Sequence, residues 1–229
     1  MKKIAIISCS RNKKERTRLY KSTKDFSQEE FKVIFHENNN TGLPKTYNKY
    51  LTKDVLKYHD ILLFIHDDVY IDDPRLFEKL YNGAKYYDII GLAGCLNPEI
   101  TIPSLWHRMA NNKDWRGYVF HRLSNKEPDK NELPDLIRCD SFGPTPSRVS
   151  IMDGLFMAVV VQKALDANWI FNESFDFHHY DIASCLDACE RGLTLGVMPI
   201  HVIHDSLGLS DPNDIHFKES EDRFMKLYS

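Results

Sequence analysis

The sequence has no hydrophobic run that could span a membrane, because nowhere do about 20 apolar residues follow one another. Near the N-terminus the apolar stretch 4–7 ends at Ser8. That is far short of the roughly 7 to 15 apolar residues in a signal peptide. We therefore expect a cytoplasmic protein without a transmembrane segment, although peripheral contact with a membrane stays compatible with the sequence.

Cysteine is scarce and irregularly spaced. Its five positions are Cys9, Cys95, Cys139, Cys185 and Cys189. No Cys-x-x-Cys pair occurs, which argues against a zinc ribbon, and the odd, uneven set does not suggest a disulfide framework. We expect free thiols in a reducing compartment.

Neither sign of charge predominates, because 30 Lys and Arg stand against 33 Asp and Glu, a formal net charge of -3. This balance, without any long basic run, argues against a nucleic-acid partner. Hydrophobic residues make up 42% of the 229 positions and aromatic residues 12%, enough for a core without disulfides or a structural metal. The composition is that of one compact domain rather than a disordered chain.

Glycine-rich phosphate-binding signatures are absent as well. Neither the Gly-x-Gly-x-x-Gly pattern of dinucleotide-binding folds nor the P-loop pattern occurs. Any nucleotide would therefore have to be held by side chains and a metal.

What the first half of the chain does contain is an alternation of apolar and helix-periodic segments. Apolar runs at 3–9, 31–36, 60–66 and 87–91 predict buried strands. Helical spacing is seen over 43–55, where Pro44 suits the first turn, and again after Asp72-Asp73-Pro74. Strand–helix–strand connections are crossovers, so we expect an α/β fold with a mostly parallel central sheet flanked by helices.

This pattern breaks between residues 96 and 147. The stretch carries six of the ten prolines: Pro98, Pro103, Pro128, Pro134, Pro144 and Pro146. Long irregular segments in compact domains are typical of functional loops, so we expect a functional excursion here. Regular structure is predicted to resume in an apolar run at 148–161, a helix at 180–191, a last core strand at 195–204 and an amphipathic helix after residue 210.

Two adjacent carboxylates, Asp67 and Asp68, stand directly after the most hydrophobic predicted strand. In open α/β sheets ligands bind beyond the carboxyl ends of the strands, and paired carboxylates there suit a hard divalent cation. The alternative is a solvated turn whose acids cap the next helix, although Asp72 and Asp73 are better placed for that role.

Further polar candidates lie in the second half. Asp181 stands at the start of a predicted helix, where it is either a helix cap or a general base whose pKa is raised by its aromatic neighbours. His201 and His204 point to opposite sides of a strand, and His204, at the strand end, is the better candidate ligand. After the first two strands, the segments Ser8-Cys9-Ser10-Arg11 and Glu37-Asn38-Asn39-Asn40 offer hydrogen-bonding groups for a base and a ribose.

Taken in order, these segments resemble the GT-A glycosyltransferases, in particular their small family-2-like members. The resemblance runs from Ile4 to about His204. The resemblance rests on the segments 38–48, 152–157 and 177–192, on Ile203-His204 and on His66-Asp67-Asp68-Val69. The last of these looks like a DxD motif with its first acid replaced.

The resemblance implies a role for each matching residue. Asp68 and His204 would bind Mn2+ or Mg2+, and Asp181 would be the general base of an inverting displacement. His66 stands where the first acid of the motif usually contacts the ribose. The residues expected at the nucleotide sugar are Ser8, Ser10, Arg11, Glu37, Asn38, Lys45, Asn48, Asp67, Asp153 and Gly154.

The implied activity is metal-dependent transfer of a sugar from a nucleotide-sugar donor, with UDP favoured, to a hydroxyl of a glycan or glycoconjugate. Residues 1–95 would form the nucleotide-sugar-binding half, 96–205 the acceptor and catalytic half, and 206–229 a tail helix. Aromatic rings stack on sugar faces, so the acceptor candidates are Trp106, Trp115 and Arg116, together with His179. Homo-oligomers stay compatible with the sequence.

Two other classes of function stay open. One is a metal-dependent hydrolase built on His66, Asp68, His178, His179 and His204, although no His-x-Asp-x-His or His-Glu-x-x-His spacing supports it. The other is a non-catalytic module that binds a sugar nucleotide or a carbohydrate.

Overall fold

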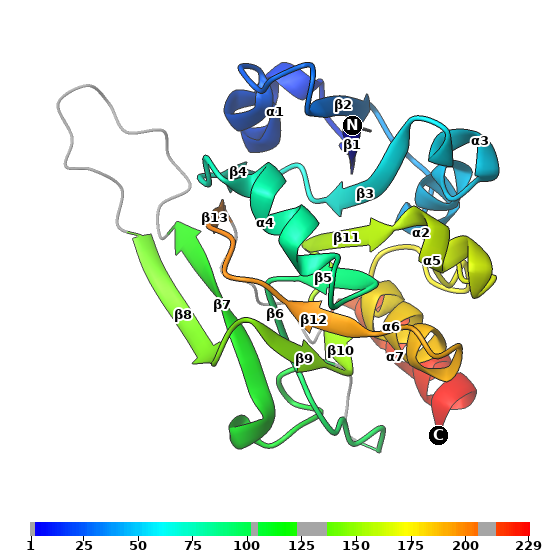
Figure 1. Cartoon of the computed structure of the whole chain (residues 1–229). Coiled ribbons are helices and arrows are strands. Elements are labelled where there is room, and N and C mark those ends of the chain that lie inside the picture. The colour runs from blue at the N-terminus through cyan, green and yellow to red at the C-terminus, as the bar shows by residue number, and fades with distance from the viewer. Residues whose placement is uncertain (1–2, 102–104, 123–136, 206–213) are drawn as a thin grey trace, which may run out of the picture.

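A computed structural model describes residues 3–101, 105–122, 137–205 and 214–229. Its strands form two sheets (Figure 1). In spatial order the larger sheet contains β2 (Phe31–His36), β1 (Lys3–Cys9), β3 (His59–Ile65), β11 (Phe156–Val160), β5 (Ile89–Gly91), β12 (Leu195–Val197) and β9 (Ser147–Val149). The smaller sheet contains β10 (Ile151–Met152), β6 (Ala93–Cys95), β7 (Trp115–Arg122), β13 (Val202–His204) and β4 (Val69–Ile71), with β8 (Ile137–Gly143) paired to β7.

The strands predicted in the first half are confirmed, with small shifts at their ends. β1 lies between β2 and β3 and runs parallel to both, so that Ile7 pairs with Ile34 on one side and Phe64 on the other. Both neighbours of β1 are strands and helices cover the faces, which is why it reads as an unbroken apolar run. β3 ends at Ile65, and His66 therefore begins the loop beyond the sheet.

The mostly parallel central sheet is confirmed, although it is mixed rather than strictly parallel: β2, β1, β3, β5 and β12 run in one direction, and β11 and β9 run against them. β11 lies antiparallel between β3 and β5, and β9 is antiparallel at the edge beside β12. β11 is reached after the long segment that forms the smaller sheet, so no helical crossover fixes its direction as parallel. The predicted run at 148–161 is likewise divided into β9, β10 and β11, with the break at Asp153 and Gly154.

The excursion at 96–147 contains regular structure. β7 and β8 pair antiparallel, and the residues of β7 alternate between buried and partly exposed, as expected for a strand with one covered face. Aromatic residues stand on both faces of β7, so the alternation is not visible in the hydrophobic pattern of the sequence. Pro103, Pro128 and Pro134 lie outside the described residues.

One predicted helix and one predicted strand are each interrupted in the structure. The predicted helix at 43–55 is divided into α2 (Leu43–Tyr47), the 3-10 turn at Asn48–Tyr50 and α3 (Lys53–Leu56), because Thr52 caps a new helix by accepting a hydrogen bond from the backbone of Val55. The predicted strand at 195–204 is divided into β12 and β13, which lie in different sheets on either side of Pro199.

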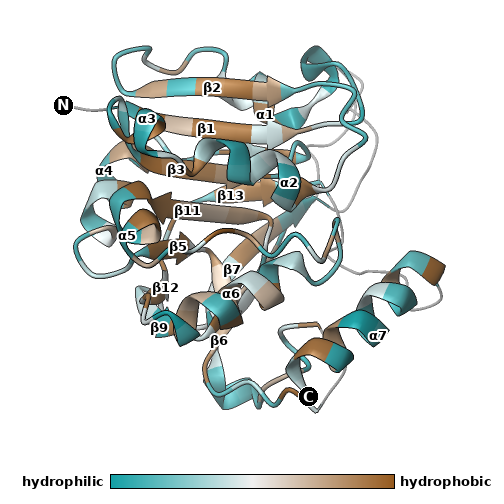
Figure 2. Ribbon diagram, turned by 90° about the vertical axis from the view of Figure 1, so that its right-hand side faces the viewer, coloured by the Kyte–Doolittle hydropathy of each residue, from teal (hydrophilic) through white to brown (hydrophobic). Residues whose placement is uncertain are grey.

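Five further helices are described around the two sheets. They are α1 (Arg18–Thr23), α4 (Leu76–Gly83), α5 (Val161–Asp166), α6 (Tyr180–Glu190) and α7 (Ile215–Tyr228), and 3-10 turns occur at Lys14–Arg16 and Asn112–Asp114. α2, α3, α5 and α6 lie on one face of the sheet, with apolar strands behind them (Figure 2). α7 is the predicted amphipathic helix, and it packs beyond α6 through buried Phe224 and the Tyr228 hydroxyl, which donates to Asp187 over 2.6 Å. No helix among the described residues is long and apolar enough to cross a membrane.

Candidate functional site

The loop after β3 is fixed in place by three backbone hydrogen bonds from other segments. The N–H of His66 donates to the carbonyl of Leu155 over 3.0 Å. The N–H of Leu19 in α1 donates to the carbonyl of Asp67 over 3.1 Å, and the N–H of Asp205 donates to that of Asp68 over 3.0 Å. The loop that carries both carboxylates is therefore tied to α1, to the turn before β11 and to the end of β13.

These anchors bring His66, Asp68 and His204 together. One ligand atom from each residue lies within 4.8 Å of the others, and His204 Nε2 is 3.3 Å from Asp68 Oδ2. Burial alone would raise the pKa of Asp68, but the hydrogen bond and charge of His204 hold it below its usual value. Burial lowers the pKa of His66, and Asp68 raises that of His204 against the opposing effect of burial.

The chemistry of this cluster fits a divalent cation. His66 Nε2, Asp68 Oδ1 and His204 Nδ1 are buried and have no hydrogen-bond partner among the described residues. Leaving buried polar atoms unpaired is costly, and a metal ion bound to the cluster would relieve part of that cost. Two imidazoles and a carboxylate suit Mn2+ and related transition-metal ions better than they suit Mg2+, which prefers oxygen ligands.

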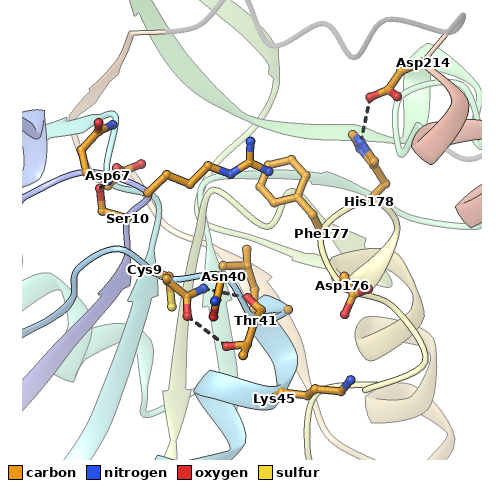
Figure 3. A pocket seen from close by; sticks show the side chains of 15 residues that line it. Cys9, Ser10, Asn40, Thr41, Lys45, Asp67, Asp176, Phe177, His178 and Asp214 are labelled. Carbon is orange, nitrogen blue, oxygen red and sulfur yellow. Dashed lines mark hydrogen bonds and ion pairs between the residues drawn. The ribbon is translucent and has the colours of Figure 1, made fainter.

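A cavity of about 840 Å3 lies beside Asp67, and we call it the larger cavity (Figure 3). The predicted residues Ser10, Arg11, Lys45 and Asp67 line it. Burial raises the pKa of Asp67, while a hydrogen bond from Ser10 partly offsets that rise. Lining residues that were not in the set expected at the nucleotide sugar include Asn39, Asn40, Thr41, Asp176, Phe177, His178 and Asp214.

These residues come from 39–41, from Asp214 before α7, and from the segment 176–178 before α6. The N–H of Leu43 donates to the carbonyl of Asp176 over 2.7 Å, and a Cβ on Gly42 would lie 2.4 Å from Asp176 Oδ1. Glycine at position 42 therefore lets this segment close against the start of α2. Phe177 is 50% exposed and its ring stacks on His66 at 5.7 Å between centroids. The neighbouring residues Asn39 and Asn40 stood in the quoted motif, whereas nothing local to Asp214 indicated its position.

Six residues predicted at the nucleotide sugar do not line this cavity, and two of them, Asp153 and Gly154, are described below. Ser8 is fully buried within β1. Glu37 accepts a hydrogen bond from the backbone of Lys14 over 2.7 Å, and Asn38 occupies a turn with φ 51°. Asn48 exchanges two hydrogen bonds of 2.9 Å with the backbone of Phe171 and thereby holds the loop before α6.

Asp153 and Asp181 are neighbours that do not line the larger cavity. Asp153 accepts hydrogen bonds from Trp106 Nε1 over 3.2 Å and from the N–H of Leu155 over 3.0 Å. Asp181, in the first turn of α6, accepts from the N–H of Gly154 over 2.8 Å. Burial, and after it the charge of Asp153, raises the pKa of Asp181 to about 7.

A smaller cavity of about 210 Å3 adjoins Asp153 and His204. The predicted acceptor residues Trp106 and Trp115 line it together with Phe142, whose ring lies 4.8 Å from that of Trp106. Arg116 does not line it, because its guanidinium donates to the carbonyls of Lys113 and Trp115.

His179 lies away from both cavities. Its ring is buried against Phe217 and Phe224 under α7, and its Nδ1 is 2.7 Å from the Ser220 hydroxyl. Burial, with a smaller effect of His178, lowers the pKa of His179 to about 4. His178 in turn faces Asp214 over 3.6 Å. The five residues of the hydrolase hypothesis therefore do not converge on one point.

Comparisons with known proteins point to one family. A family model described as a glycosyltransferase-like family matches residues 5–226. Among curated proteins, none matches the sequence.

Several solved structures are similar to this chain at low sequence identity. A197 from STIV is 13% identical, with 90% of this chain and 87% of that chain covered and a TM-score of 0.47. The catalytic domain of Drosophila beta1,4galactosyltransferase 7, in complex with xylobiose, is 10% identical with a TM-score of 0.48, and the match covers 86% of this chain and 65% of that one. TarS from S. aureus is 13% identical with a TM-score of 0.47, and here the coverage is 89% of this chain and only 37% of that one.

Proposed function

Because the chain belongs to the glycosyltransferase-like family, we propose that it transfers a sugar from a nucleotide-sugar donor to a hydroxyl acceptor with the help of a divalent cation. The observation that carries this proposal is the position of the His66, Asp68 and His204 cluster. Asp67, beside the cluster, lines the larger cavity, and His204 lines the smaller one. A donor in the first cavity and an acceptor in the second would meet at the cluster.

The cluster would hold Mn2+ or Mg2+, and its two imidazoles favour Mn2+. When bound there, the cation supplies positive charge that stabilises the diphosphate as it leaves the sugar. His66 takes part in this proposal as a ligand, in addition to Asp68 and His204. Its ring is held by Phe177, which restricts its orientation.

The nucleoside would lie in the larger cavity. Ser10, Asn39 and Asn40 offer hydrogen-bonding groups there, and Arg11 and Lys45 offer positive charge near the phosphates. UDP is the nucleotide that we would test first. The transferred sugar would lie between the cation and Asp153, on the side of the smaller cavity.

The reaction would be an inverting displacement. The acceptor oxygen forms a bond to the anomeric carbon as the bond from that carbon to the diphosphate breaks, and Asp181 takes the proton of the acceptor hydroxyl. With a pKa of about 7, Asp181 is a stronger base than an ordinary carboxylate. Trp106 and Trp115 would offer aromatic surfaces to a glycan or glycoconjugate acceptor.

This assignment keeps the division of the chain expected from the sequence. Residues 1–95 would form the nucleotide-sugar-binding half and 96–205 the acceptor and catalytic half. The tail 206–229 would add α7, whose capping residue Asp214 also lines the larger cavity.

A panel of nucleotide sugars tests the proposal, each with Mn2+, with Mg2+ and without metal. Thermal shift and release of nucleoside diphosphate would be recorded. We expect one donor to raise the unfolding temperature strongly only together with the cation, because a ligand that binds the folded state stabilises it. A hydrolase would respond to metal without needing the nucleotide, and no response to any member of the panel would contradict the proposal.

A further inference from the structure

The turn 178–179, directly before α6, has a strained backbone. His179 has φ 65°, in the left-handed region that side chains other than glycine adopt at a cost. It occupies the N-cap position of α6, but its side chain is turned to α7 instead of capping the N–H groups of α6. A strained residue persists where its surroundings hold it, so we looked for the contacts that fix this turn.

One face of α7 makes those contacts. The rings of Phe217 and Phe224 pack on the imidazole of His179, with centroid distances of 4.8 and 5.9 Å. Ser220 lies between these two residues on the helix. Its hydroxyl donates to the carbonyl of His178 over 2.8 Å, and its oxygen is 2.7 Å from Nδ1 of His179. Spacings of three and four residues place the three side chains on the same side of α7.

The hydrogen bonds of Ser220 also determine which nitrogen of the imidazole carries the proton. A serine hydroxyl has one proton, and here that proton goes to the carbonyl of His178. Nδ1 of His179 is therefore the donor to the Ser220 oxygen. Burial lowers the pKa of His179 to about 4, so the ring is neutral near neutral pH. Ser220 thus satisfies one acceptor and one donor of the turn at the same time.

The turn in its place determines where α6 begins. The carbonyl of His179 accepts the first hydrogen bond of the helix, from the N–H of Ala183 over 3.0 Å. Asp181 lies two residues after His179, in the first turn of α6, and it also accepts from the N–H of Gly154. The carboxylate is therefore held from two sides, by the turn before β11 and by the turn that α7 fixes.

We propose that Ser220 is a positioning residue for Asp181: through the turn 178–179, α7 sets the place of the carboxylate at the start of α6. The inference rests on the proposed function for the role of Asp181 as a base, although the position of Asp181 can be tested without turnover. Ser220 lines neither the larger nor the smaller cavity, so it would act on the rate only through this turn. A displacement of about 1 Å at a catalytic group can cost a large factor in rate.

The test compares Ser220→Ala with Tyr228→Phe in the full chain. Ser220→Ala removes both hydrogen bonds to the turn. Tyr228→Phe is the matched control, because it removes the hydroxyl that binds Asp187 and Asn172 at the other end of α7 and leaves the turn intact. Ser220→Thr keeps a hydroxyl and should behave as the wild type. Phe217→Leu loosens the packing on the imidazole but keeps the hydrogen bonds, and it is the second variant should Ser220→Ala not fold.

The first measurement needs no substrate. The carboxyl signal of Asp181 would be followed by NMR against pH in isotope-labelled protein, and its loss in Asp181→Asn assigns it. Burial is the main cause that raises this pKa to about 7. We therefore expect a lower pKa in Ser220→Ala, where the freed turn lets water reach the carboxylate, and a change in the same direction in Phe217→Leu. The pKa should stay unchanged in Tyr228→Phe and in Ser220→Thr.

The second measurement is turnover with the nucleotide sugar that responds in the panel. We expect Ser220→Ala to lower kcat about tenfold or more while affinities for Mn2+ and nucleotide persist, and the control to keep kcat within about twofold. An Asp181 pKa that is the same in Ser220→Ala and Phe217→Leu as in the wild type, or that falls equally in Tyr228→Phe, would overturn the inference and leave the proposed function intact. A lower pKa in Ser220→Ala alone, together with no response of the wild type to the panel, would support the positioning of Asp181 by Ser220 and contradict the transferase.

Discussion

The backbone N–H of Gly154 donates a 2.8 Å hydrogen bond to Oδ2 of Asp181. This bond connects the turn before β11 to the first turn of α6, and it orients the carboxylate beside Asp153. A Cβ on Gly154 would lie 2.8 Å from the Cβ of Asp181 and 2.6 Å from the Tyr180 hydroxyl. The close approach is therefore possible because residue 154 is glycine.

The environment of Asp181 predicts a pH dependence of transfer. Burial and the charge of Asp153 raise the pKa of this carboxyl to about 7, and a general base must be deprotonated to act. The rate at low substrate concentration should therefore rise with pH up to about 7 and then level off. A pH profile of kcat/KM checks this, and a profile that is flat down to about pH 5 would show that the base is another group.

Replacing Asp181 by Asn separates catalysis from folding. We expect Asp181→Asn to lower kcat by about 100-fold or more, because the acceptor loses its base, while binding of the metal and the nucleotide persists. A carboxyl with a raised pKa holds its proton more tightly in the folded state, so its ionisation at pH 8 lowers stability, whereas below about pH 4 it is protonated in both states. The variant should thus be more stable than the wild type at pH 8. We expect a difference of about 1–2 kcal/mol, because solvent at the partly exposed side chain screens its charge and reduces the effect.

Thermal melts at pH 8 and pH 4 measure this difference. Asp187→Asn is unsuitable as a control because Tyr228 and Asn172 bind that carboxylate, whereas exposed Asp54→Asn changes the same charge at a distant position. A variant that binds nucleotide and retains full turnover would contradict the role of Asp181.

The donor set of the metal-ligand cluster predicts its selectivity. In the wild type, two imidazoles should make Mn2+ a stronger stabiliser than Mg2+. His66→Asp supplies an oxygen ligand instead, and we expect it to reduce the preference for Mn2+ over Mg2+ by about tenfold. Metal titrations followed by thermal shift, without any substrate, measure this preference. An unchanged ratio of affinities would exclude His66 as a ligand.

Strands with a uniform environment were predictable from the sequence. β1 and β3 are flanked by strands and covered on their faces, so their apolar runs reveal that they are buried strands, and the helices predicted between the strands indicate that they run parallel. The antiparallel insertion of β11 was not predictable, because strand direction depends on how the chain returns after the excursion. β7 was missed since aromatic residues on both of its faces conceal the period-two pattern.

The same distinction applies to the candidate site: residues next to a recognisable strand were predictable, and residues placed by contacts between distant segments were not. Asp67, Asp68 and Ser10 could be placed because each follows a recognisable strand. His204 could be placed from the end of the last strand, although that strand proved to belong to the smaller sheet. The position of Asp214 at the larger cavity depends on contacts between distant segments, which leave no local signal in the sequence. Asn48 was expected at the nucleotide from its position in the motif, but its side chain is hydrogen-bonded to the backbone of Phe171 and holds the loop before α6.

Asn48 therefore predicts an effect on stability. Its side chain makes three hydrogen bonds, two to the backbone of Phe171 and one of 2.8 Å to Glu173. Asn48→Ala should lower the free energy of unfolding by about 2–3 kcal/mol. Nucleotide affinity measured well below the melting temperature should change little. Lys49→Ala, an exposed neighbour, is the control. A large loss of nucleotide affinity without loss of stability would instead place Asn48 at the donor.

The smaller cavity predicts how the acceptor is held. Trp115 lines it with part of its ring exposed, and its Nε1 donates to the carbonyl of Ala110 over 3.2 Å, which fixes the ring. If a sugar face stacks on this ring, Trp115→Ala should raise the KM for the acceptor about tenfold and leave Mn2+ and nucleotide affinities unchanged. Trp115→Phe should recover part of the loss, because it keeps an aromatic face.

Steady-state kinetics with varied acceptor at saturating donor would measure this effect. Tyr86→Ala is the matched control, since Tyr86 is 75% exposed and does not line the cavity. Because the Trp115 ring also lies 6.1 Å from that of Phe142, a general loosening of the cavity is the competing explanation. If the cavity loosens, both Trp115→Ala and Trp115→Phe should have a lower melting temperature, and Trp115→Phe should not recover the acceptor KM. If a sugar stacks on the ring, Trp115→Phe should recover part of the acceptor KM because it keeps an aromatic face. An acceptor KM equal to that of the wild type in Trp115→Ala would remove the aromatic surface from the acceptor site.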